Sequence, residues 1–330
     1  MTETLQAKAD RLHPWRYQHR HGDVVINGDP VAAPIHGDYG HGAAMMRHIL
    51  SGLAAEHDLS TWRALDLGCL EGHYTDILCE AGFNEVVAVD ISEDQILRAR
   101  FLLQELKGYT NVRIEQGSAE DAAFLTGLGK FNLILFHGLL YHLQDPVGTL
   151  SLLRNLAADP NVLLLSTQFK FNFAEVVSTS PIANLKFRKN EAGTDGLVRY
   201  SGYASAYKPA ATRLNPAALF RLMQLNGYVG LLSYDSPLGS KYGLQLHLIA
   251  GTQDLKGLRD RLNVNHALPR FRVRKWNGSH IDGIDFTQNL NARISRFMLR
   301  ATYSIIEKLG RASRSHIRRS EIAARHSNLK

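Results

Sequence analysis

One stretch of the sequence, residues 64–75, joins an apolar strand directly to a helix through a turn framed by glycines. A second apolar strand follows and ends on Asp90, 24 residues after the acid Asp66 of the first strand. Gly68 and Gly72 allow the backbone to pass close to a ligand that a Cβ atom would block. An acid at the end of the second strand can accept hydrogen bonds from a ribose diol. The layout predicts a nucleoside-binding site on an α/β fold.

The spacing of the glycines narrows the class of ligand. Dinucleotide-binding turns carry Gly-x-Gly-x-x-Gly, with the pyrophosphate at a helix N-terminus. Here three residues separate the two glycines, among them Leu70 and the acid Glu71. A carboxylate in this turn suits a cofactor without phosphates, and the sequence has no Gly-x-x-x-x-Gly-Lys-Ser/Thr phosphate-binding motif.

Two motifs, in order along the chain, resemble those of the class I S-adenosylmethionine (SAM)-dependent methyltransferases. The glycine turn is similar to motif I of that superfamily, and Asp90 resembles its ribose-binding acid. The usual pattern is Asp-x-Gly-x-Gly-x-Gly, and Leu70 here replaces the middle glycine. A subgroup with Gly-Cys-Leu-Glu-Gly also carries Leu-Tyr-His-Leu-x-Asp-Pro, which this chain has at residues 140–146.

Strand and helix patterns alternate from residue 62 onward, which predicts a parallel, doubly wound sheet. The resemblance implies a Rossmann-like α/β fold with seven strands, the last of them antiparallel. Ser92 with Gln95 forms a capping-box pattern, and Asp145 before Pro146 is an N-cap signal. The expected strands are residues 64–67, 86–89, 112–115, 132–136, 162–167, 229–234 and 245–250.

Three regions are expected along the chain. Residues 1–61 form an N-terminal cap segment, residues 62–252 form the SAM-binding core, and residues 253–330 form a basic, partly helical extension. Within the core, residues 169–213 make a connection longer than an ordinary loop, which is typical of a lid that binds an acceptor.

The resemblance assigns a set of residues to the cofactor. Asp66, Gly68 and Gly72 are expected to shape the site for its amino-acid end, and Asp90 to bind its ribose. The residues after the third strand are expected to flank the adenine. Glu71 stays open between facing the cofactor and capping the following helix. The whole predicted set is Asp66, Gly68, Cys69, Glu71, Gly72, Asp90, Ile91, Ser118, Ala119, Glu120 and His137.

Two histidines, His137 and His142, follow the fourth strand, whose carboxyl end faces the crevice where ligands bind. An imidazole can take a proton from an attacking hydroxyl group, and we favour His142 as this catalytic base over His137. The alternative is that one or both are structural, and Tyr39 and His41 are equally compatible with ordinary loop roles. The predicted acceptor-binding residues are Tyr39, His41, Tyr141, Tyr203 and Tyr207.

The net charge of +7 is concentrated in the tail. Residues 293–330 carry ten Lys and Arg against two acids, or +8, so the rest of the chain has 28 bases against 29 acids, or −1. An apolar stripe over residues 290–309, flanked by arginines, predicts a basic amphipathic helix. Such a helix can lie on an anionic membrane surface, bind a phosphate backbone or pack on the body of the enzyme.

Composition favours a cytoplasmic protein. No apolar run approaches the ~20 residues of a membrane span, and residues 1–15 lack the apolar core of a signal peptide. The two cysteines, Cys69 and Cys79, are poorly placed for a disulfide. Attachment of the tail to the inner membrane surface stays open. No set of His, Cys, Asp and Glu has metal-ligand spacing, so no metal is expected.

The sequence therefore predicts a SAM-dependent methyltransferase that modifies a hydroxyl oxygen of a sugar, a glycolipid or another small-molecule acceptor. One alternative is RNA modification, because the Gly-Leu-Leu-Tyr-His phrase is similar to that of enzymes acting on the wobble uridine of tRNA. The neutral body argues against this alternative, and the basic cluster at residues 270–275 argues for it. A non-catalytic SAM-binding module is the other alternative, because Leu70 departs from the usual motif.

Overall fold

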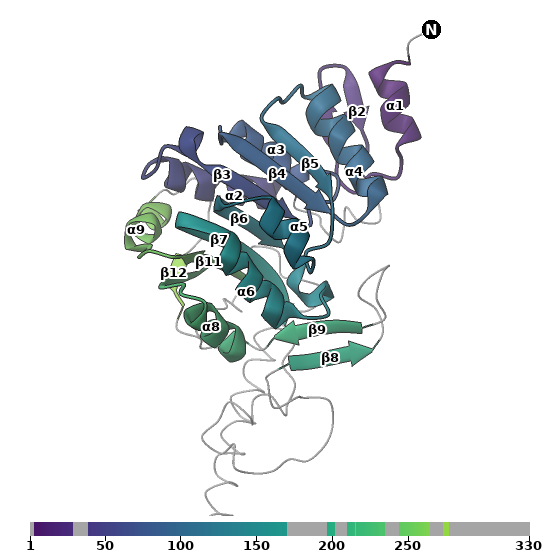
Figure 1. Ribbon diagram of the computed structural model, residues 1–330. Coiled ribbons are helices and arrows are strands. Elements are labelled where there is room, and N and C mark those ends of the chain that lie inside the picture. Colours follow the sequence, from purple (N-terminus) through teal and green to yellow (C-terminus); the bar gives the residue numbers. More distant parts are fainter. Residues whose placement is uncertain are drawn as a thin grey trace, which may run out of the picture. The chain divides into compact units, whose positions relative to one another are not determined.

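The computed structural model describes residues 3–28, 39–169, 197–201, 210–214, 216–234, 244–264 and 273–276. All of these belong to one compact unit, formed by residues 1–170 and 197–284. Figure 1 shows that this unit is built on a central sheet with helices on both faces. The predicted basic tail helix lies outside the described residues, and its role stays a prediction.

The central sheet has eight strands. They are β3 (Arg63–Leu67), β4 (Glu85–Asp90), β5 (Val112–Gln116), β6 (Phe131–His137), β7 (Ala157–Phe169), β10 (Gly230–Tyr234), β11 (Leu244–Gly251) and β12 (Val273–Lys275). Their order is β12-β10-β11-β7-β6-β3-β4-β5. The five strands from β7 to β5 run parallel, whereas β11 lies antiparallel between β7 and β10. The doubly wound, mostly parallel sheet is confirmed, and β12 is an eighth strand beyond the seven expected.

Helices cover the two faces of the sheet. On one face, α2 (Tyr39–Ala54), α3 (His73–Glu80), α4 (Glu93–Arg100) and α9 (Lys256–Val264) pack in a single apolar cluster with alternate strand residues. The opposite face carries α5 (Ala122–Gly127), α6 (Pro146–Leu156) and α8 (Pro216–Leu225), which contact one another in sequence. Because both faces are covered, runs such as residues 163–165 are wholly buried.

Smaller elements flank the sheet. The N-terminal segment contains α1 (Leu5–Arg11) and a hairpin of β1 (His19–His21) and β2 (Val24–Ile26). Short helical turns are η1 (Leu59–Thr61), the π-helix η2 (Phe101–Leu106) and η3 (Leu140–His142). The predicted lid contains an antiparallel hairpin, β8 (Leu197–Ser201) and β9 (Ala210–Leu214). Tyr203 and Tyr207, expected to bind the acceptor, lie outside the described residues.

The two predicted helix caps have different outcomes. Asp145 is confirmed as the N-cap of α6, since its Oδ1 accepts the Gly148 N–H at 2.8 Å. The capping box at Ser92 is wrong, because the Ser92 side chain makes no capping bond in α4. Its backbone N–H donates instead to Asp90 Oδ1 at 2.9 Å. The geometry at this helix start is therefore set by the acid at the end of β4.

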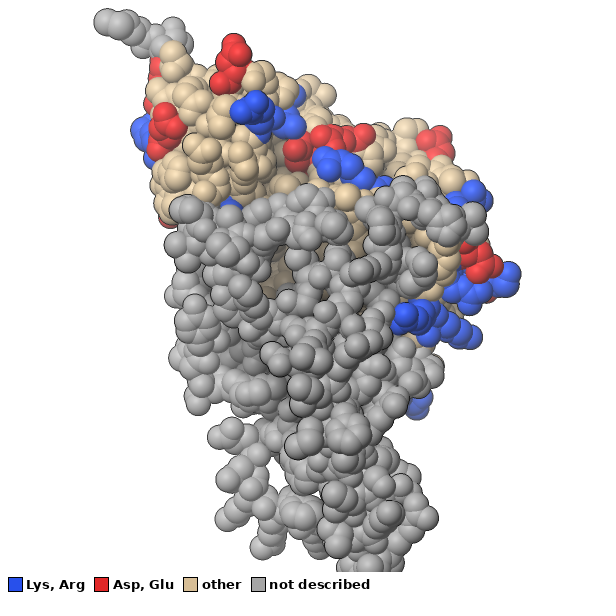
Figure 2. Space-filling model, turned by 180° about the vertical axis from the view of Figure 1, so that it is seen from behind, with Lys and Arg blue, Asp and Glu red and all other residues tan. Residues whose placement is uncertain are grey.

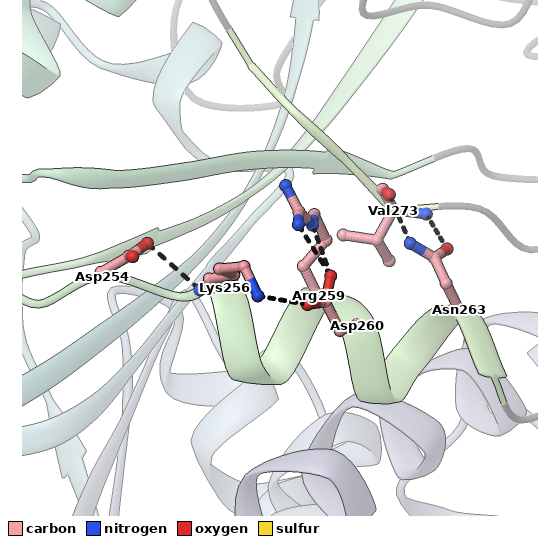
Figure 3. A network of polar contacts seen from close by, with 6 residues as sticks. All are labelled: Asp254, Lys256, Arg259, Asp260, Asn263 and Val273. Carbon is pink, nitrogen blue, oxygen red and sulfur yellow. Dashed lines mark hydrogen bonds and ion pairs between the residues drawn. The ribbon is translucent and has the colours of Figure 1, made fainter.

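A polar clamp holds the unexpected strand β12 (Figure 3). Asn263 of α9 donates from Nδ2 to the Val273 carbonyl at 2.8 Å and accepts the Val273 N–H at 2.9 Å. Beyond the strand, Trp276 is 2% exposed and its backbone N–H donates to the Leu231 carbonyl. A strand of three residues fixed by a distant asparagine leaves no periodic pattern in the sequence.

Within the part of the chain described, none of the helices combines the length and apolar character that a membrane crossing requires.

Candidate functional site

The carboxyl ends of three parallel strands meet at one edge of the sheet. Strand β3 pairs in parallel with β4 on one side and with β6 on the other. Asp66 near the end of β3, Asp90 at the end of β4 and His137 at the end of β6 are thereby brought to the same edge. The turn at residues 68–72 follows β3 directly, so it lies among these polar groups.

The turn after β3 uses left-handed backbone at three alternate positions. Gly68, Leu70 and Gly72 have φ angles of 86°, 50° and 90°. Left-handed backbone costs a residue with a side chain ~1–2 kcal/mol, so Leu70 is strained where the usual motif has glycine. The turn is held to β4, because the N–H groups of Gly68 and Cys69 both donate to the Val89 carbonyl, at 2.8 and 3.0 Å.

Asp90 fastens the strained residue. Its Oδ2 accepts the Leu70 N–H at 2.9 Å, and its Oδ1 accepts the Ser92 N–H at 2.9 Å. Burial raises the pKa of Asp90, and these N–H groups partly oppose that rise. Each carboxylate oxygen has a second lone pair, so Asp90 can still accept two hydroxyl donors. The next residue, Ile91, is 57% exposed and offers an apolar surface beside the carboxylate.

Asp66 is a second carboxyl group at this edge, and it is 3% exposed. Its Oδ2 accepts the Thr75 hydroxyl at 2.7 Å. Burial raises the pKa of Asp66 to about 7, opposed by the Thr75 hydrogen bond and reinforced by the charge of Asp90. Asp66 therefore changes its protonation near neutral pH.

Glu71 has a contact that the sequence did not predict. Its carboxylate is fully buried and accepts the backbone N–H groups of Arg16, at 3.0 and 2.8 Å, and of Tyr17, at 2.5 Å. It does not cap α3, whose N-cap residue is Gly72 with no side-chain capping bond. The structure therefore gives Glu71 an anchoring contact with the N-terminal segment, and we leave it out of the proposed cofactor-binding residues.

Aromatic contacts reinforce this anchor. The Trp15 side chain is 1% exposed, and its indole N–H donates to the Ala9 carbonyl at 2.8 Å. The ring of Tyr17 stacks on His73 with centroids 4.3 Å apart and planes 7° apart. Burial, and then the neighbouring His19, lowers the pKa of His73 to about 3. The first turn of α3 is thus packed against residues 15–19.

The loop after β5 contacts the loop after β6. The hydroxyl of Ser118 accepts the Glu120 N–H at 3.2 Å. Oε1 of Glu120 accepts the N–H groups of Gln144 at 2.7 Å and Asp145 at 2.8 Å. The predicted adenine-flanking residues therefore lie on a loop that is tied to the segment carrying His142.

The structure separates the two predicted catalytic histidines into different groups. His137 is partly exposed, and its ring meets the Tyr74 ring edge-on at 5.3 Å and the His247 ring at 6.3 Å. His142 lies in η3, where its ring centroid is 4.2 Å from that of Tyr141. Burial, and then His247, lowers the pKa of His137 to about 3.

His247 was missed as a site residue. It lies on β11, where burial lowers its pKa to about 4. An isolated histidine in an apolar strand gives no local signal, and only the strand order of the sheet brings it close to His137. Tyr39 and His41 fall in the first turn of α2, but their side chains are outside the described set. Among described residues, no group of three or more His, Cys, Asp and Glu could hold a metal ion.

The anchor at Glu71 generates a stability prediction. Glu71→Ala removes the carboxylate that accepts these two backbone N–H groups, at ~1–3 kcal/mol each, so the free energy of unfolding should fall by about 2–6 kcal/mol. Glu71→Gln keeps one acceptor and should lose less. Urea denaturation measures both, with Glu80→Ala as the control because Glu80 is an exposed acid that accepts hydrogen bonds from the exposed Arg47. Equal stability of Glu71→Ala and Glu80→Ala would contradict the anchor.

The same region matches known proteins. Residues 59–193 match a family model described as a methyltransferase domain. No curated protein shows significant sequence similarity to the chain. The N-terminal domain of EvdMO1 with SAH bound aligns at 20% identity over 76% of this chain and 96% of that one, with a TM-score of 0.56.

Two further structures align with the chain. Full-length EvdMO1 matches over 75% of this chain and 46% of its own, at 21% identity and a TM-score of 0.47. Magnesium protoporphyrin IX methyltransferase (ChlM) from Synechocystis PCC 6803 with bound SAH aligns at 18% identity over 69% and 89% of the two chains, with a TM-score of 0.46. The EvdMO1 domain supports the fold, and the family match covers the glycine turn, Asp90 and both predicted histidines. Residues 59–193 therefore match a methyltransferase domain, which agrees with the resemblance to the class I SAM-dependent methyltransferase superfamily.

Proposed function

We propose that the chain transfers a methyl group from SAM to a hydroxyl oxygen of a small-molecule or lipid-linked acceptor. The methyltransferase-domain match of residues 59–193 and the resemblance to the class I SAM-dependent methyltransferases support this chemistry. The observation that carries the cofactor assignment is the Asp90 carboxylate, which is fixed by two backbone N–H groups and keeps a free lone pair on each oxygen.

The residues around Asp90 fit the parts of the cofactor. The two free acceptor positions of Asp90 suit the two ribose hydroxyls, and exposed Ile91 offers an apolar surface to the adenine. Asp66 provides a carboxyl group near the start of the turn, where the cationic amino-acid end is expected. Ser118, Ala119 and Glu120 lie on the loop after β5, which reaches the same edge of the sheet.

The two histidines after β6 support a hydroxyl group as the methyl acceptor. SAM supplies a methyl group already activated by a sulfonium, so the protein has to align the acceptor and remove its proton. We assign proton removal to His142. A histidine with a pKa of about 3 is a weak base at neutral pH, so we assign His137 to binding.

Modification of RNA is less favoured by the described surface. In Figure 2, basic and acidic side chains are interspersed over the described part of the visible face. Binding to a phosphate backbone needs a concentrated basic surface. Of the basic cluster at residues 270–275, the structure describes Arg274 and Lys275 on β12, at the edge of the sheet farthest from β4.

The first test measures cofactor affinity. Asp90→Ala should weaken binding of adenosylhomocysteine by about tenfold to hundredfold, because a charged acceptor of two hydroxyl groups is lost. Isothermal titration calorimetry measures this, and Asp94→Ala is the matched control because Asp94 is an exposed acid on α4. Thermal unfolding without ligand shows whether Asp90→Ala has also loosened the turn. If a folded Asp90→Ala protein binds adenosylhomocysteine with unchanged affinity, the assignment of Asp90 to the cofactor is wrong.

The raised pKa of Asp66 predicts a proton linked to cofactor binding. Near neutral pH, a carboxyl group with a pKa of about 7 is protonated in about half of the molecules. A cation bound beside it favours the carboxylate and lowers that pKa, so binding of SAM should release a proton. The binding enthalpy should then vary with the ionisation enthalpy of the buffer, and Asp66→Asn should abolish the variation. Buffer-independent enthalpy in the wild type would contradict a role for Asp66 beside the cofactor.

The third test concerns the base. His142→Ala should lower turnover by about a hundredfold or more while affinity for SAM stays nearly unchanged, because only proton removal is lost. Methyl transfer from labelled SAM to a panel of hydroxylated acceptors measures it. His57→Ala serves as the control, since His57 packs on Trp62 with ring centroids 4.5 Å apart, in the segment before β3. Full activity of His142→Ala would remove His142 from the mechanism.

A further inference from the structure

Polar side chains form a row across four strands of the sheet, at the level where β6 ends. The strand register pairs His137 with Ser166, Ser166 with His247, and His247 with Tyr234. Residues paired in register project from the same face of a sheet. Tyr234 belongs to the apolar cluster of α2 and α3, so the row lies on the face that these helices cover. We call these four residues the polar row.

The polar row continues from the cofactor turn. Tyr74 lies two residues after Gly72, and its ring contacts His137 edge-on at 5.3 Å. The ring of His247 lies 6.3 Å from that of His137 and 5.2 Å from that of Tyr234. The row thus runs from the start of α3 under the covering helices, and it is partly exposed at His137.

His247 is buried, and no described residue forms a hydrogen bond with its ring. The residue is 8% exposed, and neither ring nitrogen has a partner in the described structure. Nε2 of His137 is likewise buried and has no hydrogen-bond partner among the residues that the structure describes. Burial lowers the pKa of both groups, so each is a neutral imidazole with one donor and one acceptor. Buried polar groups are nearly always hydrogen-bonded in folded proteins, so these ring nitrogens are candidates to bind a ligand with hydroxyl groups.

We propose that the polar row binds the methyl acceptor, and that His247 is an acceptor-binding residue for an uncharged, hydroxyl-rich compound such as a sugar ring. This inference rests on the proposed function. The row contains no Lys, Arg, Asp or Glu, so an anionic or cationic acceptor would be buried there without a counter-charge. A hydroxyl group both donates and accepts, which matches a neutral imidazole and the Ser166 hydroxyl.

The experiment observes the histidine rings directly. Protein labelled with ¹⁵N-histidine is saturated with adenosylhomocysteine and titrated with D-glucose, D-galactose and L-rhamnose, and separately with D-glucuronate and glucose 1-phosphate. His247→Leu removes the ring, and His247→Gln restores a donor and an acceptor. His48→Leu is the matched control, because His48 is also buried but its Nε2 is hydrogen-bonded to the Leu262 carbonyl at 3.1 Å.

At least one neutral sugar should shift the ring nitrogens of His247 and His137, and the charged sugars should not. His247→Leu should lower the affinity for that sugar by about tenfold, and His247→Gln should recover part of this affinity. His48→Leu should bind the sugar with the affinity of the wild type. Affinity for adenosylhomocysteine should stay unchanged in all three. Without ligand, His247→Leu should unfold at a higher temperature than the wild type and His48→Leu at a lower one, because only His48 loses a bonded partner.

Three results would overturn the assignment: no ring shift with any neutral sugar, normal sugar affinity in His247→Leu, or equal destabilisation of His247→Leu and His48→Leu. If the wild type binds adenosylhomocysteine but none of the sugars shifts the ring nitrogens, the polar row does not bind the acceptor, and the proposed function is unaffected. Failure of the wild type to bind adenosylhomocysteine would instead contradict the proposed function.

Discussion

The hydrogen bond from the Leu70 N–H to the Asp90 carboxylate joins the ends of β3 and β4, and the candidate site depends on it. It holds a leucine in left-handed backbone that would otherwise relax, and it fixes the direction of the carboxylate. The Val89 carbonyl adds two more bonds to the same turn. With the turn fixed, α3 starts at a defined point, and Tyr74 on that helix reaches His137.

Local patterns were sufficient for the parts of the fold that local physics decides. The apolar runs predicted every strand of the central sheet from β3 to β11, with bounds that differ from the observed ones by a few residues. The cap at Asp145 was predictable because its partner, Gly148, lies three residues away. The capping box at Ser92 failed because the Ser92 N–H, which the Gln95 side chain would accept in a capping box, donates instead to Asp90 at the end of β4.

Contacts between distant parts of the chain could not be predicted from any window of sequence. Glu71 bonds a backbone 55 residues earlier, and β12 is held by Asn263, ten residues before it. His247 and His137 meet only because β7 lies between β6 and β11 in the sheet order. The sequence around a buried carboxylate does not show whether it faces a cofactor or a pair of backbone N–H groups. Only the fold distinguishes these two roles.

Burial shifts the pKa values at this site so that the histidines stay neutral at physiological pH, whereas a carboxyl group titrates near pH 7. It lowers the pKa values of His73, His137 and His247, so these rings stay neutral across physiological pH. The folded state then binds fewer protons than the unfolded chain below about pH 6.5, the ordinary histidine pKa, so their effect is to reduce stability as pH falls through that range. Asp66 has the reverse sign, since its raised pKa contributes stability that is lost as pH rises toward about 7. Near neutral pH Asp66 therefore exchanges a proton, whereas the two histidines of the polar row stay uncharged.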